Sequence, residues 1–211
     1  MNYFDKKIDA ADVVVVDIGI SNIASVTNSL VELGYAPLVM GGPKGIENAR
    51  RVILPGNGSF RIASDRLTET GWVTALREFA KSKRPLLGIC LGMHLLASSG
   101  EEDGVSGGLG LIPGVSRRLL AGELRLPHVG WNTVDQIKSH FVFEGIKNSR
   151  DFYFSHSFAL EPSDKNLIFG TTEYGKTFAS VVGSQNIVGV QFHPEKSHHN
   201  GTRLLKNFAE S

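Results

Sequence analysis

Cys90, the only cysteine in the chain, lies between two glycines in the segment Gly88-Ile89-Cys90-Leu91-Gly92, directly after an apolar run. Glycines around a nucleophile are typical of an elbow, a tight strand-to-helix turn that lifts the side chain above a sheet. The N-terminus of the following helix would favour a thiolate, because unpaired amides and the helix dipole stabilise negative charge. The backbone N–H of Leu91 would then be free to bind an oxyanion. The alternative is that Cys90 is a small buried apolar residue.

A cysteine nucleophile needs a base and a group that orients the base. An apolar run from Val188 leads into His193, and Glu195 follows two residues later. In an extended segment, side chains two residues apart lean the same way. We therefore predict a triad of Cys90, His193 and Glu195, since geometry and not chain order defines a triad. The alternative for His193 is a solvated loop histidine.

Two more histidines, His198 and His199, follow this segment, but the sequence offers no evident carboxylate or thiolate set at metal-ligand spacing. We interpret them as surface residues at the start of a helix and expect no metal. The glycine-rich stretches 41–45 and 106–110 lack the spacing of a phosphate-binding loop. They are predicted to be turns, and we expect no cofactor.

The elements that position these residues follow an α/β order. Val13 to Asp17 runs without alternation, which indicates a strand buried on both faces. Ser21 is the expected N-cap of a helix that Gly34 closes. Further strands are predicted at 37–40, 51–54, 85–89, 152–160, 178–182 and 187–191, and helices at 61–80, loosened near Gly71, and at 200–209. The pattern predicts a single α/β domain over 13–211, with an open, mixed, mostly parallel sheet flanked by helices, after a polar arm over 1–12.

The composition of the 211-residue chain limits the classes of partner that we expect it to bind. Its 22 Lys and Arg residues nearly balance 21 Asp and Glu residues, so no strong field attracts nucleic acid or an anionic membrane. A single cysteine cannot form an internal disulfide, the first residues lack the apolar stretch of a secretion signal, and the apolar runs are far shorter than the roughly 20 residues of a membrane span. We expect a cytoplasmic protein with small-molecule or protein partners.

Five motifs, in order, resemble those of the class I, triad-type glutamine amidotransferases, a flavodoxin-like α/β family. They are PGNGSF (55–60), GICLGMHLL (88–96), LPHVGWN (126–132), YFSHSF (153–158) and QFHPEKS (191–197). Within that family the chain resembles the glutaminase subunit of imidazole glycerol phosphate synthase, an enzyme of histidine biosynthesis. The resemblance extends from about Val13 to the C-terminus.

The resemblance implies a glutaminase in which Cys90 attacks the side-chain amide of L-glutamine, His193 carries the proton to the leaving ammonia, and Glu195 holds the imidazole. The implied oxyanion site is formed by Gly56, Asn57, Gly58 and Leu91. The implied contacts to the amino-acid part of glutamine come from His94, Glu102, His156, Ser157 and Phe158. The alternatives are that Glu102 belongs to a solvated acidic loop and that Phe158 belongs to the core.

The resemblance also implies a heterodimer with a cyclase subunit, a (β/α)8 barrel that accepts the ammonia. The residues implied at the ammonia exit and the partner interface are Asn22, His128, Gly130, Trp131, Asn132, Tyr153 and Lys196. A core anchor is the alternative for Trp131, although an exposed aromatic residue beside a glycine is also typical of an interface hot spot.

Several positions depart from the family pattern. His94 stands where glutamine is usual, and because histidine titrates near neutral pH we expect glutamine affinity to depend on pH between about 6 and 8. Asn57 replaces a small apolar residue, and because asparagine tolerates the left-handed backbone region we expect weaker dependence on a partner for activation. The stretch Asp17 to Asn22 lacks a tyrosine and a glycine that the family carries there.

These departures leave other functions open. One is a paralogous glutaminase subunit that supplies ammonia to a different acceptor, such as an enzyme that aminates a sugar for a surface polysaccharide. A second is a non-catalytic binding module, although the three triad residues are all present. A third is a cysteine peptidase or esterase, which would share the elbow but would not need the 126–132 motif.

Overall fold

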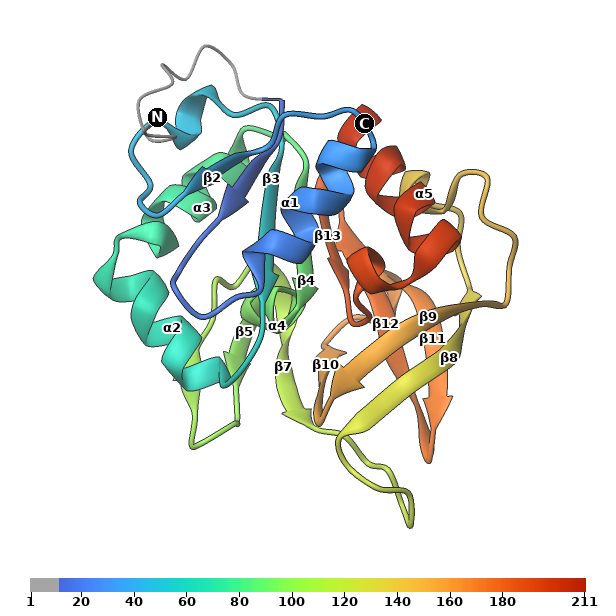
Figure 1. Ribbon diagram of the computed structural model, residues 1–211. Coiled ribbons are helices and arrows are strands. Elements are labelled where there is room, and N and C mark those ends of the chain that lie inside the picture. Colours follow the sequence, from blue (N-terminus) through green and yellow to red (C-terminus); the bar gives the residue numbers. More distant parts are fainter. Residues whose placement is uncertain (1–11) are drawn as a thin grey trace.

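The computed structural model describes residues 12–211, so the polar arm predicted over 1–12 lies outside the described residues apart from Asp12. The chain forms a single α/β domain with two sheets, which confirms the predicted mixed sheet flanked by helices (Figure 1). The prediction that the sheet is mostly parallel is wrong, because the larger sheet has equal numbers of parallel and antiparallel pairings. The larger sheet has nine strands in the order β2-β1-β3-β4-β13-β12-β11-β8-β9. The smaller sheet has four strands in the order β10-β7-β5-β6.

The first five strands of the larger sheet are parallel to one another. They are β1 (Val14–Val16), β2 (Leu38–Met40), β3 (Val52–Gly56), β4 (Leu86–Cys90) and β13 (Ile187–Val190). In β1, Val14 and Val16 join one buried cluster and Val15 joins the other, so both faces of the strand are covered as predicted. One face packs against α2 and α3 and the other against α1 and α5.

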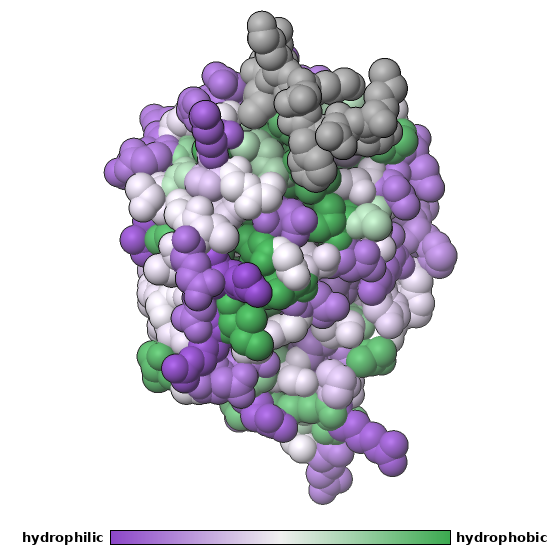
Figure 2. Space-filling model, turned by 60° about the vertical axis from the view of Figure 1, so that its left-hand side comes forward, coloured by the Kyte–Doolittle hydropathy of each residue, from purple (hydrophilic) through white to green (hydrophobic). Residues whose placement is uncertain are grey.

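The helices lie close to their predicted positions, except that the helical stretch predicted over 61–80 is two helices, which are separated at Gly71, where φ is 78°. They are α1 (Ile23–Glu32), α2 (Phe60–Glu69), α3 (Trp72–Lys81), α4 (Leu91–Leu95) and α5 (His198–Glu210), with short 3-10 turns at Ile46–Asn48, Phe141–Phe143, Lys165–Leu167 and Pro194–Lys196. The predicted N-cap of α1 is wrong, because the Asn22 side chain accepts from the Ser25 amide, whereas the Ser21 hydroxyl donates to the Pro55 carbonyl. The face of the molecule seen in Figure 2 is largely hydrophilic, with apolar side chains near its middle.

The second half of the chain builds the antiparallel part of the larger sheet and most of the smaller one. The antiparallel strands are β8 (His128–Gln136), β9 (Arg150–His156), β11 (Ile168–Tyr174) and β12 (Lys176–Ser184). The larger sheet therefore has as many antiparallel strand pairs as parallel ones. The smaller sheet contains β5 (Ala97–Gly100), β6 (Ser106–Gly107), β7 (Ile112–Arg118) and β10 (Phe158–Pro162). Part of the predicted 106–110 turn is therefore strand β6.

The strand predicted over 152–160 is wrong as a single element. It divides at Ser157 into β9, which pairs with β8, and β10, which pairs with β7 in the other sheet. The Ser157 carbonyl accepts from the Leu119 amide at 2.9 Å, and His156 Nδ1 donates to the Phe158 carbonyl at 2.7 Å. These bonds hold the chain where it passes between the sheets. Across residues 12–211, no helix has the length and apolar character to cross a membrane.

Candidate active site

Three neighbouring parallel strands end at one edge of the larger sheet and bring distant parts of the sequence together. In the register of the sheet, Gly56 at the end of β3 pairs with Cys90 at the end of β4. Strand β13 pairs with β4 on its other side and leads directly into His193. The carboxyl edge of a parallel sheet is where sites form in open α/β folds.

The elbow around Cys90 is a strained and closely packed turn. Cys90 has φ 52° and ψ −109°, in the positive-φ region that side chains rarely adopt. A Cβ at Gly88 would lie 2.6 Å from the Gly92 carbonyl oxygen, and one at Gly92 would lie 1.8 Å from the Leu54 carbonyl oxygen. Only glycine fits at both positions, so the predicted elbow is confirmed, although α4 behind it is a short helix of 5 residues.

His193 and Glu195 are joined as the sequence predicts. His193 Nδ1 lies 2.8 Å from Glu195 Oε1, and the two side chains are only 8% and 4% exposed. Burial would lower the pKa of His193, but hydrogen bonds to Cys90 and Glu195 and the charges of both groups together raise it to about 10. At neutral pH the His193 imidazole is therefore protonated. The solvated-loop alternative for His193 is wrong.

Ser197 fixes this loop to the neighbouring strand and is a residue that the sequence analysis missed. Its hydroxyl donates to the His193 carbonyl at 2.6 Å and accepts from the Tyr153 amide at 3.0 Å. The His193 amide in turn donates to the Tyr153 carbonyl at 2.8 Å. These bonds tie the histidine to β9, and nothing in the spacing of Ser197 alone signals this role.

A cavity of about 330 Å³ opens beside Cys90. It is lined by Asn57, Gly58, Ser59, Cys90, Leu91, His94, Glu102, Pro127, Ser155, His156, Ser157 and Phe158. Nine of these are predicted site residues, and Ser59, Pro127 and Ser155 are additional. Phe158 lies partly exposed at the cavity and is not a core residue. The Cys90 thiol lies 3.8 Å from the Ser155 carbonyl oxygen, which places the nucleophile at the cavity wall.

The predicted oxyanion residues surround the start of α4. The first amides of a helix have no partner within it, so the N–H of Leu91 is available beside Cys90. A Cβ at Gly56 would lie 2.6 Å from Leu91 Cβ and 2.7 Å from the Gly92 amide nitrogen, which shows how closely this strand end approaches the helix. Asn57 is exposed at the cavity, and Gly58 has φ 102°.

Glu102 lines the cavity and does not belong to a fully solvated loop. Its Oε2 accepts from the Phe60 amide at 2.7 Å and so caps the N-terminus of α2. Burial raises the pKa of Glu102 and Asp103 adds to the rise, while the bond from Phe60 opposes it. Ser59 donates to Asp103 at 3.0 Å, so the acidic loop is attached to the start of α2.

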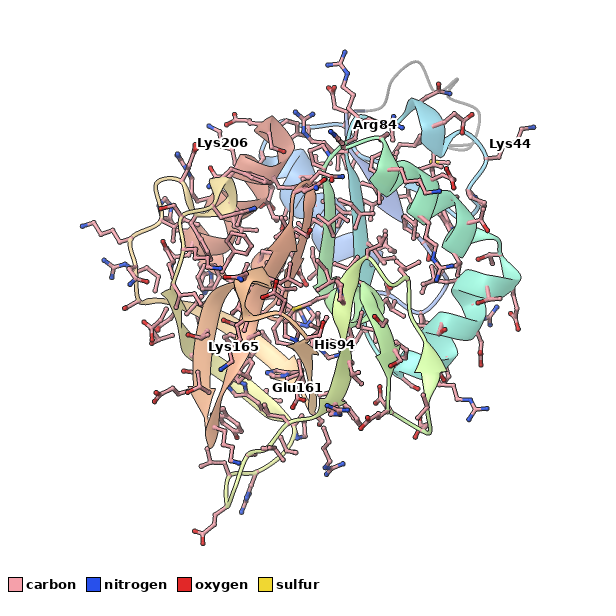
Figure 3. The ribbon with its side chains drawn as sticks, turned by 180° about the vertical axis from the view of Figure 1, so that it is seen from behind. Lys44, Arg84, His94, Glu161, Lys165 and Lys206 are labelled. Carbon is pink, nitrogen blue, oxygen red and sulfur yellow. The ribbon has the colours of Figure 1, made fainter. Side chains whose placement is uncertain are left out.

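His94 is deeply buried, and the expectation of a pH-dependent glutamine contact between pH 6 and 8 is wrong. Figure 3 shows it in the interior, whereas Lys44 and Lys206 project from the surface. The residue is 4% exposed, and its Nε2 lies 2.7 Å from Gln191 Oε1. Burial lowers the pKa of His94 to about 4, so the ring stays neutral over that whole range.

His156 and His128 form a buried chain of hydrogen bonds behind the cavity. Because His156 Nδ1 donates to a carbonyl, its Nε2 accepts from His128 Nδ1 at 2.9 Å. His128 Nε2 then accepts from Asn132 Nδ2 at 3.2 Å, and that amide also donates to the Glu173 carbonyl at 2.9 Å. Burial lowers the pKa of His156 to about 3 and that of His128 to about 4, so both rings are neutral.

The remaining predicted partner residues lie near the same edge, most of them accessible. Trp131 is 47% exposed, which excludes a core anchor, and its ring stacks on His198 at 5.0 Å. Lys196 Nζ lies 5.7 Å from the centre of the Tyr153 ring. Asn22 is exposed but is used as the cap of α1, and His128 is buried.

His198 and His199 are exposed at the start of α5, as predicted. Within residues 12–211, no group of three or more acidic, histidine or cysteine side chains is arranged to hold a metal ion.

Comparison with known proteins identifies relatives over nearly the whole chain. The family model of glutamine amidotransferase class-I matches residues 14–211. The imidazole glycerol phosphate synthase subunit HisH of Moorella thermoacetica is 46% identical over 198 residues, 94% of either chain. The subunit of the same name from Sulfurimonas denitrificans is 42% identical over 202 residues, 94% of this chain and 97% of that relative.

Solved structures share the fold at low sequence identity. PurLQS from Thermotoga maritima has a TM-score of 0.75 at 15% identity, with 94% of this chain and 97% of that one covered. A crystal structure of a glutamine amidotransferase has a TM-score of 0.74 at 18% identity, covering 93% of this chain and 97% of the other. These matches concern the fold, whereas the family model and the HisH relatives match the sequence over nearly the whole chain. The chain therefore belongs to the class I glutamine amidotransferase family.

Proposed function

We propose that this chain is the glutaminase subunit of an imidazole glycerol phosphate synthase and supplies ammonia to a cyclase partner in histidine biosynthesis. The observation that carries the proposal is the buried Cys90, His193 and Glu195 arrangement at the wall of a cavity of about 330 Å³. The relatives named as subunits of that synthase, at up to 46% identity, favour this acceptor over the paralogous one.

The geometry supports hydrolysis through a thioester. The Cys90 thiolate adds to the side-chain carbonyl carbon of glutamine, and the N–H of Leu91 with the Gly56–Gly58 strand stabilises the oxyanion. His193 gives its proton to the departing nitrogen, and ammonia leaves as the C–N bond breaks. The neutral imidazole then takes a proton from water, which attacks the thioester and releases glutamate and the thiolate. Removing an oxyanion donor typically costs two to three orders of magnitude in rate.

The amino-acid part of glutamine is proposed to bind in the same cavity. The backbone from His156 to Phe158 is the proposed carboxylate site, and Glu102 is the proposed partner of the ammonium group. Trp131, Tyr153 and Lys196 lie toward the exposed side and are proposed to meet the cyclase barrel. Free ammonia protonates in water, so efficient transfer requires this side to be sealed by the partner.

The test measures glutamate release by the purified chain, alone and with a cyclase subunit of such a synthase and its nucleotide substrate. Turnover that depends on both Cys90 and the cyclase supports the proposal, with Cys90→Ala as the blank. Turnover that needs Cys90 but ignores the cyclase would exclude this acceptor. The same experiment tests Asn57, for which we propose weak partner dependence; a rise of several hundredfold on adding the cyclase would contradict that part.

A further inference from the structure

Gln191 is a buried polar side chain to which the reaction described above gives no role. It follows β13 directly and precedes His193 by two residues. Its accessible fraction is 0%, so its amide must find partners inside the protein. Its backbone amide donates to the Ser180 carbonyl at 2.9 Å, which continues the pairing of β13 with β12. This hydrogen bond holds the backbone from which the side chain extends.

The two ends of the Gln191 amide contact two different residues of the site. Oε1 lies 2.7 Å from His94 Nε2, and Nε2 lies 4.0 Å from Cys90 Sγ. An amide oxygen only accepts, so the neutral His94 ring donates to it. With the oxygen held by His94, the NH2 group is directed at the sulfur. In the tautomer with the proton on Nε2, the buried histidine holds the amide with its NH2 group toward Cys90.

A buried thiolate needs such a donor. Cys90 is 6% exposed, and charged sulfur is costly to bury without hydrogen bonds. The titratable groups that face it are His193 beyond β13, His94 on α4, and His156 and Glu102 at the cavity. Among these, His193 carries the proton that must later leave for ammonia. An uncharged amide can keep stabilising the sulfur while that proton moves.

We propose that Gln191 is a further catalytic residue of the glutaminase, whose amide N–H stabilises the Cys90 thiolate, and that His94 is its positioning residue. The inference rests on the proposed function for its meaning in catalysis. It also gives His94 a different role from the glutamine contact that the family resemblance implies, because the Nε2 atom is occupied by Gln191.

The test uses the fact that Cys90 is the only cysteine in the chain. The rate of alkylation by iodoacetamide, followed against pH without glutamine, therefore reports this thiolate with no background. Gln191→Met keeps the length of the side chain and removes the donor. Alkylation at pH 7 is expected to slow about three- to tenfold, since bonds to charged groups are among the stronger ones. For glutamine hydrolysis, kcat is expected to fall by a similar factor with little change in KM.

Gln136→Met is the matched control. Gln136 donates to the Ile146 and Lys147 carbonyls from β8, outside the cavity residues, so the same substitution should leave alkylation unchanged. His94→Leu removes the group that orients the amide and should slow alkylation in the same direction. His94→Gln again offers an N–H to Oε1 and should recover most of the rate.

A second variant keeps the test decisive if Gln191→Met does not fold. Gln191→Glu retains the shape and an acceptor for His94 but directs a carboxyl group at the sulfur, so the alkylation midpoint should rise by about one pH unit or more. An unchanged profile in a folded Gln191 variant would overturn the inference. Absence of glutamine hydrolysis in the unsubstituted chain with its partner would instead count against the proposed function, and the alkylation profiles would still report on Gln191.

Discussion

His128 and His156 share a hydrogen bond of 2.9 Å between Nδ1 and Nε2, and the carbonyl of Phe158 decides its direction. His156 must accept on its second nitrogen because its first is a donor. This orders the segment His156 to Phe158, which lines the cavity beside Cys90. A residue of the LPHVGWN motif is thus connected to the cavity beside Cys90 through buried polar contacts.

Removing His128 should affect both stability and glutamine binding. In His128→Leu, His156 Nε2 loses its donor in a buried position, which typically costs about 1–3 kcal/mol. The ring also stacks on Tyr174 with centroids 3.9 Å apart, and part of that contact would be lost. We expect a lower midpoint in urea unfolding and a higher KM for glutamine. His199→Leu, at an exposed position, is the control; equal stability of the two variants would refute the role of His128.

Acid should destabilise the fold through its neutral buried histidines. The pKa of His94 is about 4 in the folded chain against 6.5 ordinarily, so between these values the unfolded chain binds a proton that the folded chain does not. The free energy of unfolding therefore falls as pH drops from 6.5 to about 4. His128 and His156 act in the same direction. His193 acts oppositely, because its raised pKa adds stability below 6.5 that is lost as pH rises through about 10.

The His94→Gln variant isolates one of these protons. Its free energy of unfolding should fall less steeply than that of the unsubstituted protein as pH drops from 6.5 to about 4. The two slopes should differ by at most about 1.4 kcal/mol per pH unit, which corresponds to one proton. Urea unfolding at a series of pH values measures the slope. Parallel pH profiles for the two proteins would mean that folded His94 titrates as it does in the unfolded chain.

The parallel half of the sheet and the triad were predictable because their signals are local. A continuous β-branched run identifies β1, and glycines on both sides of Cys90 fit only a turn where Gly88 and Gly92 approach other backbone atoms. His193 and Glu195 are two residues apart, so their contact needs little knowledge of the rest of the fold. For these elements, short-range sterics and burial determine the structure.

The parts that could not be predicted depend on distant partners. Residues 152–160 read as one strand, but the first part pairs with β8 and the last part with β7, and these two pairings divide it between two sheets. Strand β8 itself contains Gly130 and Asn132, which weaken a strand pattern. Ser197 and Gln191 have ordinary residue types, and their roles follow from the sheet register that places β9 and α4 beside them.

The Glu195 carboxylate should control the charge of His193. Glu195→Gln removes an anion 2.8 Å from Nδ1, so the pKa of His193 should fall below about 10. Loss of an oriented general acid and base typically costs at least on the order of 10²-fold in rate. Glutaminase kcat and the NMR titration of His193 measure the two effects. Glu101→Gln is a surface control, since Glu101 pairs with Arg117 at 3.0 Å where both side chains are more than 40% exposed; the same NMR titration in both variants would exclude this coupling.

Gly92 offers the sharpest test of the elbow, because any side chain there collides with β3. A Cβ would lie 1.8 Å from the Leu54 carbonyl oxygen, which is a backbone atom of β3, so β3 or α4 must move to relieve the contact. Gly92→Ala should lower the free energy of unfolding by about 3 kcal/mol or more, which is the upper end of the range for overpacked sites. Gly107→Ala is the matched control, since a Cβ there meets nothing within 4 Å, and its effect should stay within about 0.5 kcal/mol. A shift of α4 that relieves the collision would displace the Leu91 amide. The folded fraction of Gly92→Ala should therefore also lose glutaminase activity and Cys90 alkylation. Full reactivity in that fraction would show that neither the Leu91 amide nor the reactivity of Cys90 depends on this turn.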